Sequence, residues 1–132
     1  MYIGSSINKS PTISAVAGAK ITGGAGKAVK FDSNGKIVLC SVAGEAALGI
    51  LILQTADEVA AGDSVTVQIA AIGQALAGGS IAAGDLLAVT TDGTLTKAAA
   101  TNYVVGQALS AGSANGIVEC IICRGGQLNS GT

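Results

Sequence analysis

The segment Ala28-Val29-Lys30-Phe31-Asp32-Ser33-Asn34-Gly35-Lys36-Ile37 decides the fold, because its pattern returns later in the chain as Ala88-Val89-Thr90-Thr91-Asp92-Gly93-Thr94-Leu95. Each copy predicts a β-strand, a tight turn closed by Asn-Gly or Asp-Gly, and a second strand. Each copy then leads to an apolar segment that begins with a glycine, at Gly49 and at Gly106. The chain is therefore predicted to be built from two similar hairpin units.

Turn signals recur along the whole chain at the spacing of about 8–12 residues that is typical of β-sandwiches and barrels. We expect an all-β fold, a small antiparallel β-barrel or sandwich with an extended N-terminal arm. Residues 57–61 and 98–102 are predicted to form at most single helical turns. A first strand is possible around Ile13–Ala17. The further strands are expected at Ala28–Phe31, Lys36–Cys40, Leu48–Leu53, Ser64–Ile69, Leu86–Thr90, Leu95–Ala98, Tyr103–Leu109 and Ile117–Cys123.

In two of the expected strands, the distribution of apolar residues over the two faces predicts what each face contacts. In Ser64–Ile69, Val65 and Val67 alternate with Thr66 and Gln68, which indicates one buried face and one wet or interface face. The strand Ile117–Cys123 is apolar on both faces. We therefore expect it to lie centrally in its sheet, or between the core and another subunit.

The domain organisation is predicted to be simple, since 132 residues make one domain. Residues 1–24 are assigned to an arm and the first strand, residues 25–125 to the β domain, and residues 126–132 to a Gly- and Ser-rich tail that is flexible in isolation. The polar leader of the arm is the candidate partner-binding segment. Its candidate contact residues are Tyr2, Ile3, Ile7, Lys9 and Pro11.

Composition argues against several classes of function. The chain has no His and only 11% charged residues against 49% hydrophobic ones, so few groups are available for catalysis or metal binding, and no cofactor is expected. A formal net charge of −1 with scattered basic residues disfavours nucleic acid as a partner. The longest apolar run, residues 46–53, is far shorter than the roughly 20 residues of a membrane-spanning helix, and no secretory signal is evident. So little charge on so apolar a chain suggests that a partner covers part of the surface.

Three motifs invite a catalytic or metal-binding interpretation, and each has a stronger structural one. Around Gly23–Lys27, Ile21 and Ala28 stand where a phosphate-binding loop needs Gly and Ser or Thr. Cys120 and Cys123 have the spacing of half a metal site, with Cys40 as a third thiol, but positions three apart in a strand face opposite sides, so buried cysteines are expected instead. Asp57-Glu58 is the only adjacent acidic pair and is interpreted as a solvated loop.

Gly-Asp turns before a strand, an Asp-Gly hairpin followed by Lys97 and a run of Ala, a Gly-led apolar segment and a closing strand resemble tailed-phage head decoration proteins, also called capsid cement proteins. The resemblance covers roughly Lys27 to Cys123 and is strongest from Ala82. It implies a structural virion protein, made in the host cytoplasm, that forms a homotrimer on the outer surface of the bacteriophage head. It further implies contact with the major capsid protein, stabilisation of the expanded capsid by bridging its subunits, and no catalytic residues.

Two other classes of function stay open at this point. A glycan-binding or adhesive β-domain would need exposed aromatic rings, for which only Tyr2, Phe31 and Tyr103 are available. A hydrolase would have to use Asp57 and Glu58, and without histidine no Ser-His or Cys-His pair can form. We expect the protein not to be an enzyme.

Overall fold

The computed structural model describes residues 11–52 and 58–128. All regular structure in these residues is β, and the strands form two five-stranded antiparallel sheets with a further short pair, β2 and β6. The strands are β1 (Thr12–Val16), β2 (Ile21–Thr22), β3 (Ala28–Phe31), β4 (Ile37–Leu39), β5 (Gly49–Ile52), β6 (Glu58–Val59), β7 (Ser64–Gln68), β8 (Ala71–Leu76), β9 (Leu86–Val89), β10 (Leu95–Lys97), β11 (Tyr103–Ala108) and β12 (Ile117–Gln127).

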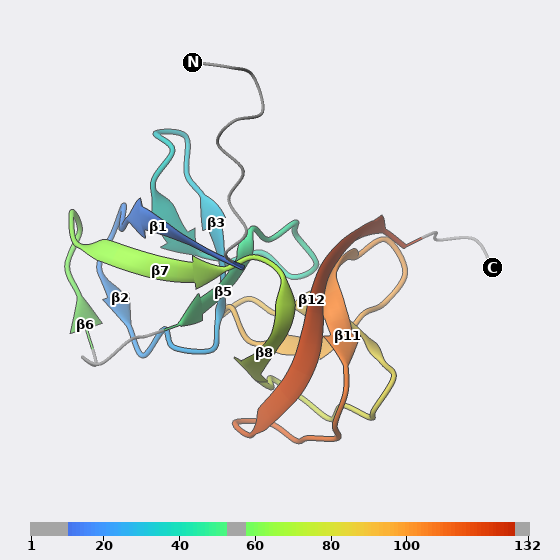
Figure 1. The fold of residues 1–132 in the computed structure, drawn as a ribbon. Helices are drawn as coiled ribbons and strands as arrows, with labels where there is room; N and C mark the ends of the chain where they lie inside the picture. The colour runs from blue at the N-terminus through green and yellow to red at the C-terminus, as the bar shows by residue number, and fades with distance from the viewer. Residues whose placement is uncertain (1–10, 53–57, 129–132) are drawn as a thin grey trace, which may run out of the picture.

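The two sheets have the same strand order, and each is made from one half of the chain. The first sheet runs β1-β7-β5-β3-β4 and the second runs β8-β12-β11-β9-β10. We call residues 12–68 lobe 1 and residues 71–127 lobe 2; Figure 1 shows them side by side. The predicted repeat is therefore confirmed, and it extends from a hairpin to a whole five-stranded unit.

Hydrogen bonds at the strand ends fix which residues of the two lobes are equivalent. Ala17 bridges Ile37 as Ala77 bridges Leu95, in both cases through a single parallel bridge. Because one bridge is not a ladder, each sheet stays open rather than closed into a barrel. Gly49 pairs with Val29 as Gly106 pairs with Leu87.

The two lobes bury separate cores and also pack against each other. Lobe 1 has an internal cluster around Ile21, Val29, Ile37, Leu51 and Val67. The cluster inside lobe 2 takes in four further residues from lobe 1, which are Ala28, Cys40, Ala47 and Ile50. These four therefore belong to the contact between the lobes.

Backbone hydrogen bonds cross the boundary between the lobes. The Ala28 amide donates to the Gly93 carbonyl at 2.7 Å, and the Leu76 amide donates to the Gly26 carbonyl at 2.8 Å. Gly44 donates to Val89 and accepts from Tyr103, at 2.9 Å each. Such directional bonds fix the relative position of the lobes in a way that apolar burial alone does not.

Most sequence-based expectations are confirmed, and the differences have physical causes. The fold is all-β and antiparallel, and Val65 and Val67 are buried between half-buried Thr66 and Gln68. In residues 98–102 a single turn forms, closed by the Asn102 amide on the Ala99 carbonyl, and Glu58–Val59 pairs as β6 rather than joining a helical turn. Strand β12 continues beyond Cys123 to Gln127, because Tyr103 and Val104 of β11 pair with its end. The proposed boundaries at residues 24 and 125 stay a prediction.

Candidate interaction surface

The structure fixes only the base of the predicted partner-binding arm. Tyr2, Ile3, Ile7 and Lys9 lie outside the described residues. Pro11 is exposed, and its carbonyl accepts a hydrogen bond from the Ile69 amide at 2.7 Å, beside the start of β1. Pro11 therefore lies at the edge of lobe 1, beside the residues that link lobe 1 to lobe 2.

Exposed apolar side chains gather on the outward face of the lobe 2 sheet. Strand register places Ile72, Ile121, Gln107 and Leu86 in one row across β8, β12, β11 and β9. Ile72 is 61% exposed, and Ile121 and Leu86 are 39% exposed each. Ile117, further along β12, is 66% exposed. We call these five residues the open face.

The equivalent row of lobe 1 has a different environment. It consists of Thr12, Gln68, Ile50 and Ala28 across β1, β7, β5 and β3. Ile50 and Ala28 are fully buried because lobe 2 packs over them, and the remaining two positions are polar. The same fold therefore does not require isoleucine at the places of Ile72 and Ile121.

A groove of about 450 Å³ lies beside the open face, between the lobes. Leu51 and Ile52 line it from lobe 1, and Ile72, Leu76 and Ile117 line it from lobe 2. Its polar side chains are Gln68 and Gln74, and Gln68 Nε2 donates to the carbonyls of Ala70 and Ile72 at 3.0 and 2.9 Å. With no charged side chain in its lining, the groove offers shape and apolar contact rather than acid–base chemistry.

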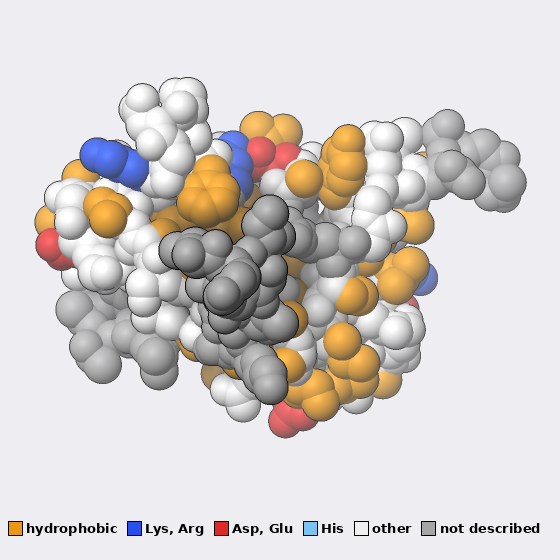
Figure 2. Space-filling model, turned by 45° about the horizontal axis from the view of Figure 1, so that its top comes forward, with side chains coloured by type: hydrophobic (Ala, Val, Ile, Leu, Met, Phe, Trp, Pro, Cys, Tyr) orange, Lys and Arg blue, Asp and Glu red, His pale blue; other side chains and the backbone are white. Residues whose placement is uncertain are grey.

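Charged side chains are few and scattered over both lobes, as Figure 2 shows for the side that it presents. Lys30 Nζ contacts Glu45 Oε1 at 2.7 Å, and the Ser41 and Val42 amides donate to Glu45 Oε2. Burial by itself would raise the pKa of Glu45, but Lys30 and the two amides together lower it. This arrangement holds the loop that carries Gly44 against lobe 2.

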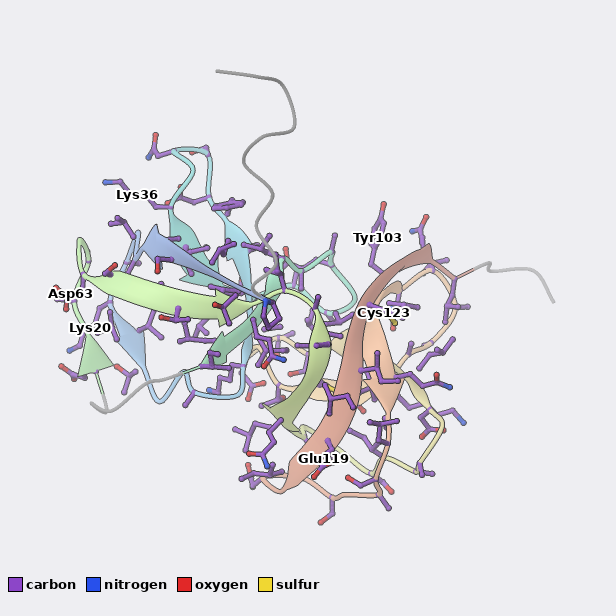
Figure 3. All side chains as sticks on the ribbon, in the orientation of Figure 1. Lys20, Lys36, Asp63, Tyr103, Glu119 and Cys123 are labelled. Carbon is purple, nitrogen blue, oxygen red and sulfur yellow. The ribbon has the colours of Figure 1, made fainter. Side chains whose placement is uncertain are left out.

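The three cysteines occupy two kinds of environment. Cys40 and Cys120 are buried, whereas Cys123 is exposed on β12 (Figure 3). The prediction that Cys120 and Cys123 face opposite sides is confirmed, but the prediction that all three are buried is wrong for Cys123. Its outward position follows from strand alternation, because Cys123 shares a face with Ile121. The thiols therefore do not form a shared metal site, and the described residues hold no group of three or more potential metal ligands.

We predict that a maleimide reagent labels one thiol per native chain at pH 8 and all three after denaturation. Burial raises the pKa of Cys40 to about 12, aided by the nearby Glu45 carboxylate. Burial, together with the charge of Cys123, also raises the pKa of Cys120. Since the thiolate is the reactive species, both should stay unlabelled. Intact-protein mass spectrometry counts the adducts, and Cys123→Ser should abolish native labelling.

The structure describes one residue of the acidic pair and the whole glycine-rich segment. Asp57 lies outside them, and Glu58 forms an exposed ion pair with Lys20 at 3.0 Å. The segment 23–27 is the link between β2 and β3, where Gly26 takes a positive φ of 82° and receives the Leu76 amide on its carbonyl. The two described candidate aromatic residues lie on different lobes, because Phe31 ends β3 in lobe 1 and Tyr103 begins β11 in lobe 2.

Asp92 organises the turn at the tip of the β9–β10 hairpin. Its Oδ1 accepts hydrogen bonds from the hydroxyls of Thr90 at 2.6 Å and Thr94 at 2.7 Å, and from the Thr94 amide at 3.2 Å. These bonds lower the pKa of Asp92 to about 2, with the Thr90 hydroxyl as the largest cause. The turn matters beyond its own strands, because the Gly93 carbonyl in it receives the Ala28 amide of lobe 1.

This carboxylate is expected to make stability depend on pH in acid. Its pKa is lower in the folded chain than the ordinary 3.8, so its stabilising effect is complete above about pH 4 and is lost as the pH falls toward 2. We predict that the urea midpoints of wild type and Asp92→Asn differ most near neutral pH and converge below pH 3.8. A difference that does not change with pH would mean that the charge of Asp92 contributes nothing.

Comparison with known proteins finds similarity among solved structures. No protein-family model matches the sequence, and no curated protein matches it. Among solved structures, the chain is similar to the crystal structure of the head fiber gp8.5 N base in bacteriophage phi29, with a TM-score of 0.65. The match covers 89% of this chain and 97% of that chain at 21% sequence identity. The two chains share a fold.

That shared fold agrees with the all-β architecture expected from the sequence. The sequence predicted only part of the open face. The apolar character of β12 on both faces was the available signal, and it indicated either a central place in the sheet or a subunit contact; β12 does lie between β11 and β8. The edge strand β8, which supplies Ile72, was not predicted, because Ala71-Ile72-Gly73-Gln74-Ala75-Leu76 contains Gly and Ala rather than β-branched alternation. The described residues contain no helix long and apolar enough to cross a membrane.

Proposed function

We propose that this protein is a structural component of a bacteriophage virion that binds the outer surface of the head and bridges major capsid protein subunits. The observation that carries the proposal is the likeness of its fold, over 89% of the chain, to the base of a phage head fiber. In this proposal the protein acts as a homotrimer, stabilises the expanded capsid and has no catalytic activity.

The physical character of the surface supports a binding role. The open face and the groove beside it present aliphatic side chains and amides, and Glu58, the described residue of the acidic pair, is engaged in an exposed ion pair with Lys20. The lobes are joined by four backbone hydrogen bonds, so a partner would meet a preformed surface and lose little entropy in ordering it.

A decoration protein that binds only the expanded lattice would stabilise that lattice by mass action. Each occupied site adds a free energy set by the affinity of the protein and its concentration. Many copies on one shell then act together, even where a single contact is weak. This mechanism needs a rigid binder in many copies, and it needs no reactive side chain.

The proposal is tested by co-sedimentation of the purified protein with undecorated expanded heads and with unexpanded precursor shells. We expect saturable binding to expanded heads, in multiples of three copies per repeating unit, and none to precursor shells. Thermal release of packaged DNA should then shift to higher temperature in decorated heads. No binding to either particle would contradict the head-binding role.

A further inference from the structure

The two lobes of one chain pack through two different surfaces, one on each lobe. Lobe 1 contributes its outward sheet face, including Ala28 and Ile50. Lobe 2 contributes its hairpin tip at Gly93 and the end of β9 at Val89, both hydrogen-bonded to lobe 1. Because the lobes are repeats of each other, each surface has an equivalent on the other lobe.

The equivalent of the lobe 2 contribution is uncovered on lobe 1. Asn34-Gly35 forms the corresponding hairpin tip, which is exposed. Phe31 stands at the place of Val89, since it is followed by Asp32, whose amide donates to the Lys36 carbonyl as the Thr90 amide donates to the Thr94 carbonyl. Val89 is 2% exposed whereas Phe31 is 48% exposed. We call Phe31, Asn34 and Gly35 the rim.

The equivalent of the lobe 1 contribution is uncovered on lobe 2, and it is the open face. Leu86 stands at the place of Ala28, and its carbonyl accepts the Ala98 amide as that of Ala28 accepts the Cys40 amide. The Ala28 amide is bonded to Gly93 of the other lobe and Ala28 is fully buried, whereas Leu86 is 39% exposed. Both surfaces of the contact are therefore present a second time, and there they are exposed.

We infer that the open face of lobe 2 receives the rim of lobe 1 from a second copy of this chain. The contact repeats between copies the packing that joins the lobes within one copy. It names the self-contact of the homotrimer proposed above and rests on that part of the proposed function. Since the two surfaces differ, the contact is heterologous, and such a contact forms closed rings when its rotation allows.

The chemistry of the open face fits a second copy better than a partner met later. The four apolar side chains of the open face leave on the order of 400 Å² uncovered, as large as the main apolar patch of an ordinary monomer. That area could form the centre of an interface that buries roughly 800 Å² per partner. The five residues of the open face carry no charge, and Glu119 lies on the same side of β12, between Ile117 and Ile121, so this surface is mainly aliphatic with one carboxylate (Figure 3). Interfaces of this aliphatic kind are typical of permanent homo-oligomers.

Two variants remove one side of the contact each. Ile72→Thr combined with Ile121→Gln installs on lobe 2 the residues that lobe 1 has at the equivalent positions, Thr12 and Gln68, so the fold should tolerate them. Phe31→Ser removes the rim. Val42→Ser is the control, because Val42 is 58% exposed and lies outside both surfaces.

Analytical ultracentrifugation should find a trimer for wild type and Val42→Ser and a monomer for each of the other two variants, with the dissociation constant raised roughly 100-fold. An equimolar mixture of the open-face and rim variants should form a one-to-one heterodimer, because one intact contact is left between them. A trimeric open-face or rim variant, or a mixture that stays monomeric, would overturn the inference while leaving a trimer possible. A monomeric wild type would contradict the trimer itself, and co-sedimentation with heads would still test the binding role independently.

Discussion

Replacing Ile50 with Asp should destabilise the protein by roughly 3–5 kcal/mol, because the substitution removes a buried side chain and places a carboxylate in the apolar contact between the lobes. Ile50 is fully buried and clusters with residues of lobe 2. A protein of this size has a total stability of about 5–15 kcal/mol, so the variant should lose much of it. The urea unfolding midpoint measures the loss, and Ile50→Ala, expected to cost about 2–4 kcal/mol, covers the case in which the Asp variant does not fold.

The repeat supplies a matched control at the equivalent position of lobe 2. Gln107 pairs with Leu86 and Ile121 as Ile50 pairs with Ala28 and Gln68, but Gln107 is exposed. Gln107→Asp loses one hydrogen bond, from Nε2 to the Gly84 carbonyl, and should cost about 1 kcal/mol. Because Gln107 belongs to the open face, both Asp variants are compared in the Phe31→Ser background, where no second copy is expected to cover that face. Equal losses at the two positions would mean that lobe 2 does not cover lobe 1 as described.

Replacing Gly49 with Ala should destabilise the protein by roughly 1–3 kcal/mol, although alanine adds only one methyl group. A Cβ at Gly49 would overlap the backbone carbonyl oxygen of Gln68 on the neighbouring strand β7. Backbone in the middle of a sheet cannot move aside as a flexible side chain does. The equivalent Gly106 meets the carbonyl oxygen of Ile121 in the same way, so both lobes place glycine where two strands approach closely.

Gly79→Ala is the control for this prediction. An added Cβ there would have the Thr96 hydroxyl as its nearest neighbour, at 3.0 Å, and that side chain can rotate. The urea midpoint should therefore change little for Gly79→Ala and fall clearly for Gly49→Ala. A Gly49→Ala variant as stable as wild type would show that β5 and β7 can separate locally without cost.

Local sequence was enough to predict the strands that carry a short-range signal. Asn34-Gly35 and Asp92-Gly93 each close a hairpin, with positive φ values at both glycines. Alternation around Val65 and Val67 predicted the buried face of β7 correctly. These signals succeed because turn geometry and side-chain direction depend on a few neighbouring residues.

A repeated tetrapeptide predicted similar turns correctly, but the two turns do not lie at equivalent positions of the two lobes. Ala60-Ala61-Gly62-Asp63 and Ala82-Ala83-Gly84-Asp85 form the same turn, in which the Asp amide donates to the first Ala carbonyl at 3.1 Å. The first turn precedes β7 and the second precedes β9, which occupy different places in their sheets. Similar tetrapeptides therefore mark similar turns, whereas the equivalence of the lobes follows from strand pairing.

The sequence by itself determined an all-β antiparallel chain with a repeated hairpin and few reactive groups. Only the tertiary structure decided that the repeat is a five-stranded lobe, that lobe 2 covers Ile50 of lobe 1, and that the isoleucines of lobe 2 stay open. The physical reason is distance along the chain. Turns and alternation involve neighbouring residues, but whether an outward apolar side chain becomes core or surface depends on which distant segment packs against it.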